Sequence, residues 1–339
     1  MTDDAGTTRP DHREPDGATV ARREPDGAIA DRREPALTLT ERVFEAVDRR
    51  LPYLFLVPAL ALVASLVVYP VVRAVELSLH EVVLINLSDQ QFVGVSNYAT
   101  VVSDPVFATV MRNTVVFVGA SVLGQVAVGL GLALLLERRW LGGRLTRLFR
   151  LAFVLPWATT GVIVAFSWQF MFHPRMGIVN ETLRALGVAT PPTWLNSTRW
   201  AMAAVIVATV WRGVPFSLIF QTSGLQSIPS RLYEAADVGG ASPVQTVRHV
   251  TVPLLWPFVA MNLVLVTLFT VNVFDIVFVM TGGGPLHATE VLSLYMYETA
   301  FDVGAFGRAN AVAVILFGLN VAVVALYLVA FDRGNGGAR

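Results

Sequence analysis

The chain has 339 residues, of which 54% are hydrophobic and 15% charged, and its formal net charge is zero. This composition is typical of a membrane protein and excludes the basic surface of a nucleic-acid-binding protein. It contains no cysteine, which excludes disulfides and cysteine-based zinc sites, and no lysine, which excludes a Walker A loop and therefore the ATPase role for this chain.

Residues 1–50 are polar and repetitive. The pattern Arg-Glu-Pro recurs at a ten-residue period, and Asp, Glu, Arg, Pro and Gly dominate. Such a segment buries too little apolar surface to fold, so we predict a disordered cytoplasmic tail without the apolar core of a secretory signal. A solvated tail is favoured over a regulatory or tethering role.

Six apolar blocks follow the tail, each near the ~20 residues that a helix needs to cross a bilayer. They predict an all-α membrane domain over residues 51–331 and a short cytoplasmic tail over residues 332–339. The blocks are Tyr53–Leu77, Asn113–Leu136, Leu151–Phe172, Trp200–Ser223, Trp256–Thr281 and Ala309–Phe331.

Arginines predict the orientation of these spans, because cytoplasmic connections carry the excess of positive charge. The 136–150 connection and the segment before the first span are rich in arginine, whereas the 80–106 connection has none. Both termini and the connection between the fourth and fifth spans are therefore predicted to be cytoplasmic. The arginines on this side are Arg42, Arg49, Arg50, Arg138, Arg139, Arg144, Arg147, Arg150, Arg231, Arg248 and Arg333.

A polar stretch, residues 227–253, separates the fourth and fifth spans. We predict two short helices with a glycine corner: the first capped by Ser230 and ending at Gly239-Gly240, the second capped by Ser242 with Gln245 completing a capping box. A helix as short as the first buries little surface by itself. Its expected role is to dock in a groove of a partner.

Ionisable residues within the spans point to a transport path, because each is costly in hydrocarbon. Arg212 lies near the middle of the fourth span and Asp275 toward the outer end of the fifth, with Asn272 one helical turn before it. Aromatic residues Trp211, Phe216, Phe269 and Phe274 flank them, and amide, carboxylate and aromatic groups together suit a sugar. An internal structural network is the alternative, favoured for Arg212. Gln125, Gln169 and Asn262 are weaker candidates.

The outer connections are substantial. Residues 177–187 predict an amphipathic helix, residues 191–195 an aromatic turn, and residues 291–297 form an apolar run. They suit either the docking of an external binding protein or interfacial packing against lipid headgroups, and the residues alone do not decide between these.

The polar stretch resembles the EAA loop of permease subunits of ATP-binding-cassette (ABC) importers. The matching residues are Glu234, Ala235, Ala236, Gly240, Ala241, Val250 and Pro253, whereas Gly239 stands where that family usually has Asp. The resemblance implies a type I importer permease fold in which this loop contacts the ATPase. The coupling residues that it implies are Arg231, Leu232, Tyr233, Glu234, Ala235, Ala236, Gly240 and Ala241.

A wider resemblance, over residues 51–331, is to MalF/UgpA-like carbohydrate-importer permeases. It is carried by residues 94–98, 211–216, 225–229, 274–275 and 280–285. It implies a non-catalytic, multi-pass subunit in the cytoplasmic membrane of a prokaryote, with a second permease subunit, two copies of an ATPase that binds ATP and Mg, and an extracytoplasmic binding protein. This chain would bind no cofactor or metal. The candidate pathway residues are Gln169, Trp211, Arg212, Asn272, Phe274 and Asp275.

Other classes fit less well. An importer of a polyol or glycerophospho-compound would have the same architecture. An ion-driven secondary transporter requires buried carboxylates or histidines, and Asp275 is the one acidic residue deep in a predicted span. An intramembrane enzyme is disfavoured because all five histidines fall in the tail or in loops.

Overall fold

The computed structural model of the chain describes residues 55–137, 153 and 157–335. The predicted tail 1–50 and the five arginines of the 136–150 connection lie outside these residues, as do the side chains of residues 332–339. The chain divides into two compact units, Met1–Leu62 and Val63–Arg339. The described part of the first unit, residues 55–62, is helical, and the elements named next belong to the second.

Among the described residues, 5 helices are long and apolar enough to cross a membrane: Phe55–Ser78, Pro105–Leu136, Ala201–Gln226, Pro243–Val271 and Phe306–Phe331. They correspond to five of the predicted spans. The predicted span 151–172 is described only in part, and there α6 (Gly161–Met171) is a shorter apolar helix. The helical architecture predicted from the sequence is confirmed, whereas the count of six spans stays a prediction.

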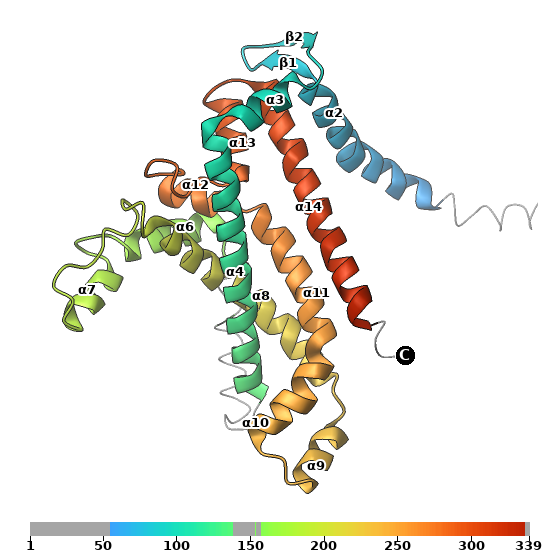
Figure 1. Cartoon of the computed structure of the whole chain (residues 1–339), viewed down its shortest axis with the longest axis vertical. Coiled ribbons are helices and arrows are strands. Elements are labelled where there is room, and N and C mark those ends of the chain that lie inside the picture. The colour runs from blue at the N-terminus through green and yellow to red at the C-terminus, as the bar shows by residue number, and fades with distance from the viewer. Residues whose placement is uncertain (1–54, 138–152, 154–156, 336–339) are drawn as a thin grey trace, which may run out of the picture. The chain divides into compact units, whose positions relative to one another are not determined.

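The long helices are named as in Figure 1. They are α2 (Tyr69–Ser78), α4 (Pro105–Glu137), α8 (Ala201–Gln226), α11 (Val252–Val271) and α14 (Phe306–Asn335). A short π-helical segment, η1 (Ala64–Val68), precedes α2 in the same span. The fifth predicted span differs most from its prediction. Its helix begins at α10 (Pro243–Thr246), continues through a π-helical segment η2 (Val247–Thr251) into α11, stops at Val271 and resumes as α12 (Asp275–Thr281).

A β-hairpin joins the first and second spans, a feature that the all-α prediction missed. Strands β1 (His80–Val83) and β2 (Asn86–Phe92) pair antiparallel, and α3 (Ser96–Ser103) follows. All of β2 is exposed, so it shows none of the alternation that reveals a half-buried strand in a sequence. The amide of Asn97 ties the hairpin to its surroundings by donating to the carbonyls of Ser78 (2.8 Å) and His80 (2.9 Å).

Helices α4 and α8 pack closely because glycines lie between them. Gly124 faces Val210, Gly129 faces Ser217, and Gly213 faces Gln125. Such small residues let backbones approach within a membrane, where apolar burial alone does not drive association. The glycine pattern therefore brings the polar residues of the fourth span close to α4.

This packing makes a prediction for Gly129. A Cβ added there would lie 2.6 Å from the Cβ of Ser217, so Gly129→Val is expected to cost roughly 1–3 kcal/mol through overpacking. Gly131, two residues further along α4, has no atom within 4 Å of an added Cβ, and Gly131→Val is the matched control. Thermal unfolding of the detergent-solubilised variants should lower the midpoint for the first alone. Equal midpoints would contradict the close α4–α8 contact.

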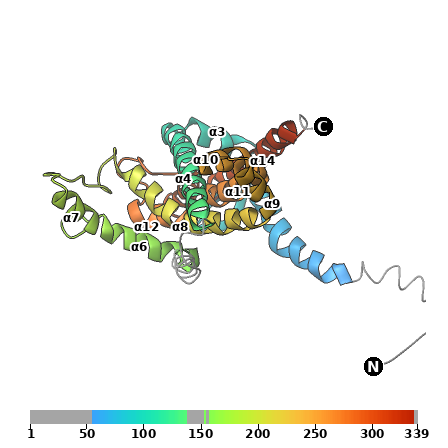
Figure 2. The ribbon, with the colours of Figure 1, turned by 90° about the horizontal axis from the view of Figure 1, so that it is seen from below.

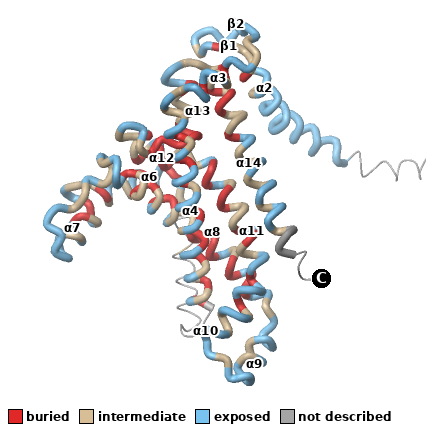
Figure 3. Tube along the Cα trace, viewed as in Figure 1, coloured by how far each residue is buried: buried red, intermediate tan, exposed pale blue. Residues whose placement is uncertain are grey.

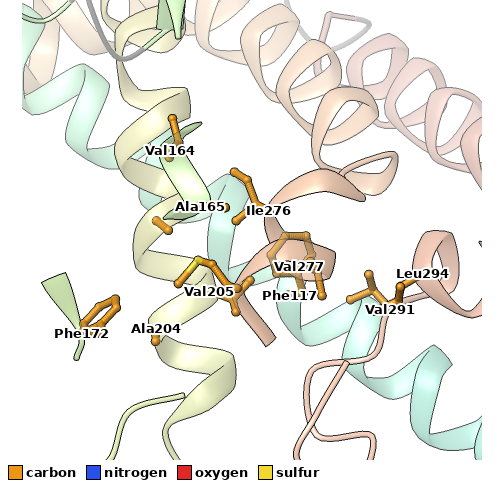
Figure 4. Packing of buried hydrophobic residues seen from close by; sticks show 12 residues of the cluster. Phe117, Val164, Ala165, Phe172, Ala204, Val205, Ile276, Val277, Val291 and Leu294 are labelled. Carbon is orange, nitrogen blue, oxygen red and sulfur yellow. The ribbon is translucent and has the colours of Figure 1, made fainter. Parts of the chain in front are cut away.

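The largest apolar core lies where α4, α6, α8 and α12 converge. Figure 4 shows Phe117 of α4, Val205 of α8 and Val277 of α12 packed together, with Val291 and Leu294 beside them. Figure 3 shows which parts of the bundle are buried: α8 and α11 have long buried stretches, whereas α9 (Ser230–Val238) is exposed. The core thus fixes α12 against α8, which positions Asp275 and Arg212.

The polar connections gather at two opposite ends of the bundle. Helices α9 and α10 lie at one end, which Figure 2 views from below, and the hairpin, α3 and α13 (Leu292–Phe301) lie at the other (Figure 1). The predicted outer helix is present as α7 (Ile178–Ala185). This separation agrees with the sides that the arginines predict, and the membrane side of each end stays a prediction.

Candidate functional site

The first candidate site is the surface of α9. None of its residues is buried. Leu232, Glu234 and Ala235 are exposed and Val238 is 91% exposed, whereas Tyr233 and Ala236 are half-buried. The hydroxyl of Thr251 donates to that of Tyr233 over 3.4 Å. Tyr233 and Ala236, three residues apart, share the face that rests on the chain, and the other face is open to a partner.

The ends of the two helices correct one detail of the prediction. The N-cap of α9 is Pro229 in an extended conformation, and Ser230 is already helical with no side-chain cap bond, because the proline ring sets the chain direction one residue earlier. The capping box at Ser242 is confirmed: its amide donates to the Gln245 side chain over 2.7 Å, and the Gln245 amide donates to Ser242 Oγ over 3.4 Å.

The two glycines of the corner differ. Gly240 has φ of +73°, a left-handed conformation, whereas Gly239 has φ of −73° and ψ of 0°, which any residue adopts. The backbone therefore gives no reason for glycine at position 239, where the EAA family usually has Asp.

Because Gly240 alone has a left-handed conformation, we expect substitution of the two glycines to have different effects. Gly240→Ala places a Cβ in the left-handed region at a cost of roughly 1–2 kcal/mol. Gly239→Ala is the matched control and is expected to cost much less. Hydrogen exchange of the amides of residues 230–246 should show lower protection in the first variant only. Equal protection in both would contradict the conformation of the corner.

The second predicted short helix is in fact the start of a long one. From Pro243 to Val271 the helix runs for 29 residues without a break, a length of about 43 Å at ~1.5 Å per residue. Helix α9 contacts this long helix through the hydrogen bond between Thr251 and Tyr233.

The second candidate site lies beyond that far end. Asp275 is the first residue of α12, and its Oδ2 lies 3.8 Å from Nη1 of Arg212 on α8. Both side chains are about one third exposed. The carboxylate also accepts from the amide of Ile276 over 3.0 Å and lies against Gly161 at the start of α6, where any Cβ would overlap it. The carboxylate thus lies beside a guanidinium and at the start of both α6 and α12.

Arg212 lines a small cavity of about 100 Å³. Gln125 and Thr270 meet across it, with the amide Nε2 donating to Thr270 Oγ1 over 3.2 Å. Phe216 and Phe269 form an edge-to-face pair with centroids 5.5 Å apart. The other lining residues are Trp157, Thr209, Gly213, Val266, Val273 and Ile276. The cavity combines amide, hydroxyl and guanidinium groups with aromatic faces.

The other predicted pathway residues lie elsewhere. Asn272 and Asp275 do not share a helix face, because α11 ends at Val271 and α12 begins only at Asp275. Asn272 instead donates to Asn320 Oδ1 over 3.0 Å. Phe274 stacks on Phe278 at 5.1 Å. Trp211 contacts Trp168 edge-on at 6.1 Å and lines a separate apolar cavity. The structure therefore brings Arg212 and Asp275 together, and Asn272, Phe274 and Trp211 are not among the residues that line the cavity beside Arg212.

Gln169 belongs to a larger cavity of about 1090 Å³ between α6 and α12. Its amide donates to the carbonyl of Val279 over 3.4 Å. Phenylalanine rings, histidine, arginine and amide groups share the lining, with Phe166, Phe170, His173, Arg175 and Asn196 among them. The chain thus has two cavities of mixed aromatic and polar character, a smaller one lined mainly by α8 and α11 and a larger one lined by α6 and α12.

The sequence did not identify several of the residues that line the smaller cavity. Gln125 was a weaker candidate, and Thr209, Thr270 and Trp157 were not candidates. A threonine in an apolar span commonly bonds its own helix, as Thr209 does to Val205 over 2.9 Å, so its type alone gives no signal. Gln125 packs against Gly213 of α8, and this contact follows only from the packing of the two helices.

An exposed amphipathic helix between two spans and a polar cavity within the bundle are the features of a transport protein of the membrane. Residues 125–333 match the family described as binding-protein-dependent transport system inner membrane component. The chain belongs to this family, and it is thus a multi-pass permease subunit of an ABC importer in the cytoplasmic membrane, distinct from the subunit that hydrolyses ATP.

Several relatives are similar to this chain along most of their length. The sulfoquinovosyl glycerol transport system permease protein SmoG of Agrobacterium fabrum is 36% identical over 281 residues, covering 83% of this chain and 90% of that protein. The trehalose/maltose transport system permease protein MalF of Thermococcus litoralis is also 36% identical, covering 83% and 93%. A bacterial ABC transporter involved in the import of alginate has the same fold, with a TM-score of 0.72 at 22% identity over 87% of this chain and 99% of the matched chain.

No group of three or more histidine, aspartate or glutamate residues within the described part of the chain could hold a metal ion.

Proposed function

We propose that this permease passes a sugar or a related carbohydrate across the cytoplasmic membrane and that a separate ATPase drives it through α9. The observation that carries the proposal is the continuous helix from Pro243 to Val271. This helix contacts α9 through Thr251, and its far end lines the cavity beside Arg212, which lies next to Asp275. Closure of an ATPase dimer against α9 would shift this helix relative to α8. Access to the cavity would then alternate between the two sides.

A carbohydrate substrate is supported by the chemistry of both cavities. Sugars present hydroxyls to amide and charged groups and apolar ring faces to aromatic side chains, and both kinds of group line each cavity. Two relatives are named for the transport of sulfoquinovosyl glycerol and of trehalose and maltose. A polyol or glycerophospho-compound offers similar hydroxyls and is the alternative within the same architecture.

The assembly that we propose has further members. A second permease subunit would complete the translocation pathway, two copies of the ATPase would bind ATP and Mg, and an extracytoplasmic binding protein would deliver the substrate. Residues 51–331 would form the six-span domain, with cytoplasmic tails over residues 1–50 and 332–339. In this arrangement the EAA loop, residues 227–253, and both termini face the ATPase.

Uptake by the complete complex in proteoliposomes tests this function. With ATP enclosed and the cognate binding protein outside, a labelled mono-, di- or oligosaccharide should accumulate, and a non-hydrolysable ATP analogue should abolish the accumulation. An ionophore should leave it unchanged. Uptake that persists without ATP but disappears with the ionophore would instead establish an ion-driven transporter. Accumulation of glycerophospho-compounds or polyols but of no sugar would overturn the carbohydrate assignment.

A further inference from the structure

The start of α13 packs against both halves of the broken fifth span. Leu292 is fully buried and shares an apolar cluster with Val271, the last residue of α11. Its neighbours Val291 and Leu294 belong to the cluster that contains Val277 of α12, and Figure 4 shows them beside it. One short segment thus contacts the helix before the break and the helix after it.

A hydroxyl of the same segment bonds to the break itself. The break comprises residues 272–274, between the end of α11 and the start of α12, and the ends of helices leave backbone groups without their helical partners. Ser293 Oγ donates to the carbonyl of Val273 over 2.6 Å. Ser293 is only 4% exposed, so water does not compete for this bond. Asp275, whose carboxylate lies beside Arg212, is two residues beyond the bonded carbonyl.

The start of α13 is in turn fastened to α4. Thr114 Oγ1 accepts from the amide of Leu292, the first residue of α13, over 2.9 Å. The N-cap residue of this helix is Val291, whose side chain makes no cap bond. The neighbouring Asn113 donates to the carbonyl of Glu290 over 3.2 Å. A buried threonine on another helix therefore does for α13 what an N-cap side chain does within a helix.

The break has a second contact, with α14. Asn272 donates to Asn320 Oδ1 over 3.0 Å, and Asn320 donates to the carbonyl of Leu316 over 2.8 Å. Asn272 is exposed and Asn320 is half-buried, whereas Ser293 and its support Thr114 are buried. Because α14 also holds the break, loss of the Ser293 bond should loosen it without unfolding the chain.

We propose that Ser293 and Thr114 are positioning residues for the transport pathway: through the start of α13 they fix the break in the fifth span in the geometry that brings Asp275 to Arg212. Asp275 is the first residue of α12, so the direction in which the chain leaves the break sets where its carboxylate lies. Neither Ser293 nor Thr114 lines the cavity beside Arg212, so each acts through Asp275. The effect on uptake rests on the proposed function, whereas the effect on the break does not.

Hydrogen exchange of the full-length chain in detergent micelles tests the structural part. Ser293→Ala removes the donor to the Val273 carbonyl, so the protection factors of the amides of residues 272–278 should fall roughly five- to tenfold, the factor that corresponds to one net hydrogen bond. Thr114→Val removes the acceptor of the Leu292 amide with little change in shape and should lower the protection of the same amides.

Two matched variants make this measurement specific. Thr114→Ser keeps the hydroxyl and should retain the protection of the parent. Ser223→Ala removes a hydroxyl that bonds only within its own helix, to the carbonyl of Ile219 over 3.0 Å, and should also leave residues 272–278 unchanged. Unchanged protection in both Ser293→Ala and Thr114→Val would overturn the proposal, as would an equal loss in Thr114→Ser.

Uptake by the reconstituted complex tests whether Ser293 acts through Asp275. Ser293→Ala alone should reduce ATP-driven uptake roughly five- to tenfold, and Ser223→Ala should not reduce it. In the Asp275→Asn background, Ser293→Ala should add less than about a twofold loss, because the carboxylate that it positions is already absent.

Two results of this cycle would overturn the positioning role. They are normal uptake by Ser293→Ala, and a full further five- to tenfold loss in the Asp275→Asn background, which would show that Ser293 acts independently of Asp275. A parent complex that transports no sugar would overturn the proposed function instead. The exchange measurement would then still decide whether Ser293 and Thr114 hold the break.

Discussion

Replacement of Asp275 by asparagine is expected to reduce ATP-driven uptake by roughly 10- to 100-fold, the range that corresponds to the loss of one charge-assisted interaction of about 1.5–3 kcal/mol. The carboxylate lies 3.8 Å from Arg212 and against the start of α6, so its removal leaves the guanidinium unpaired beside the cavity. Because both side chains are about one third exposed, the pair itself contributes little to stability. The variant should therefore insert and fold, and uptake in proteoliposomes is the measurement.

The double replacement Arg212→Gln with Asp275→Asn separates a pathway role from a structural one. If the pair only holds α8 against α12, the double variant no longer contains the unpaired guanidinium that Asp275→Asn leaves behind. Most of the uptake that Asp275→Asn loses should then be restored. If the two groups contact the substrate, the double variant should stay as impaired as the single ones. Asp89→Asn on the exposed strand β2 is the matched control and should transport normally. Full uptake by both Asp275→Asn and the double variant would remove this site from the transport route.

Replacement of Glu234 by glutamine should uncouple ATP hydrolysis from transport. Glu234 is exposed on α9 and has no hydrogen-bond or ion-pair partner among the described residues, so its carboxylate is free to pair with a basic group of another chain. Loss of one charge-assisted contact predicts a reduction in coupled uptake of about tenfold or more. The measurement is the ratio of sugar imported to ATP hydrolysed in the reconstituted complex.

Two variants make this result specific. Glu181→Gln applies the same change to the exposed helix α7, which projects from the side of the bundle away from α9 (Figure 1), and should leave the ratio unchanged. Combining Glu234→Gln with Gly240→Ala adds distortion of the corner and should lower the ratio further while the subunit remains in the membrane. Normal coupling in the combined variant would mean that α9 does not transmit the work of the ATPase.

Local signals in the sequence predicted much of this architecture. The apolar blocks located the spans, and the capping box at Ser242 and the glycine at 240 located the ends of the helices in the polar stretch. These features depend on residues close together in the chain, so their type and spacing are sufficient. The predicted cap at Ser230 was wrong by one residue because Pro229 was not recognised as the boundary.

Features that depend on distant contacts were not predictable in the same way. The break at Asn272 has no proline or glycine to mark it, and Asn272 instead bonds to Asn320, which lies 48 residues further along the chain. The Arg212–Asp275 pair likewise requires the core around Val205 and Val277 to bring α8 and α12 together. The two residues were recognised separately from their chemistry, but their contact follows only from the packing.

Site-directed crosslinking tests most directly whether α9 is the surface on which the ATPase acts. The chain contains no cysteine, so a single cysteine introduced at Val238, which is 91% exposed, is the sole thiol of the subunit. With single cysteines placed around the groove of the partner ATPase, Val238→Cys should form a crosslink whose yield changes between the ATP-bound and nucleotide-free states. Ile85→Cys in the hairpin, 96% exposed at the opposite end, should form none. A crosslink from Ile85→Cys, or none from Val238→Cys in either state, would contradict coupling through α9.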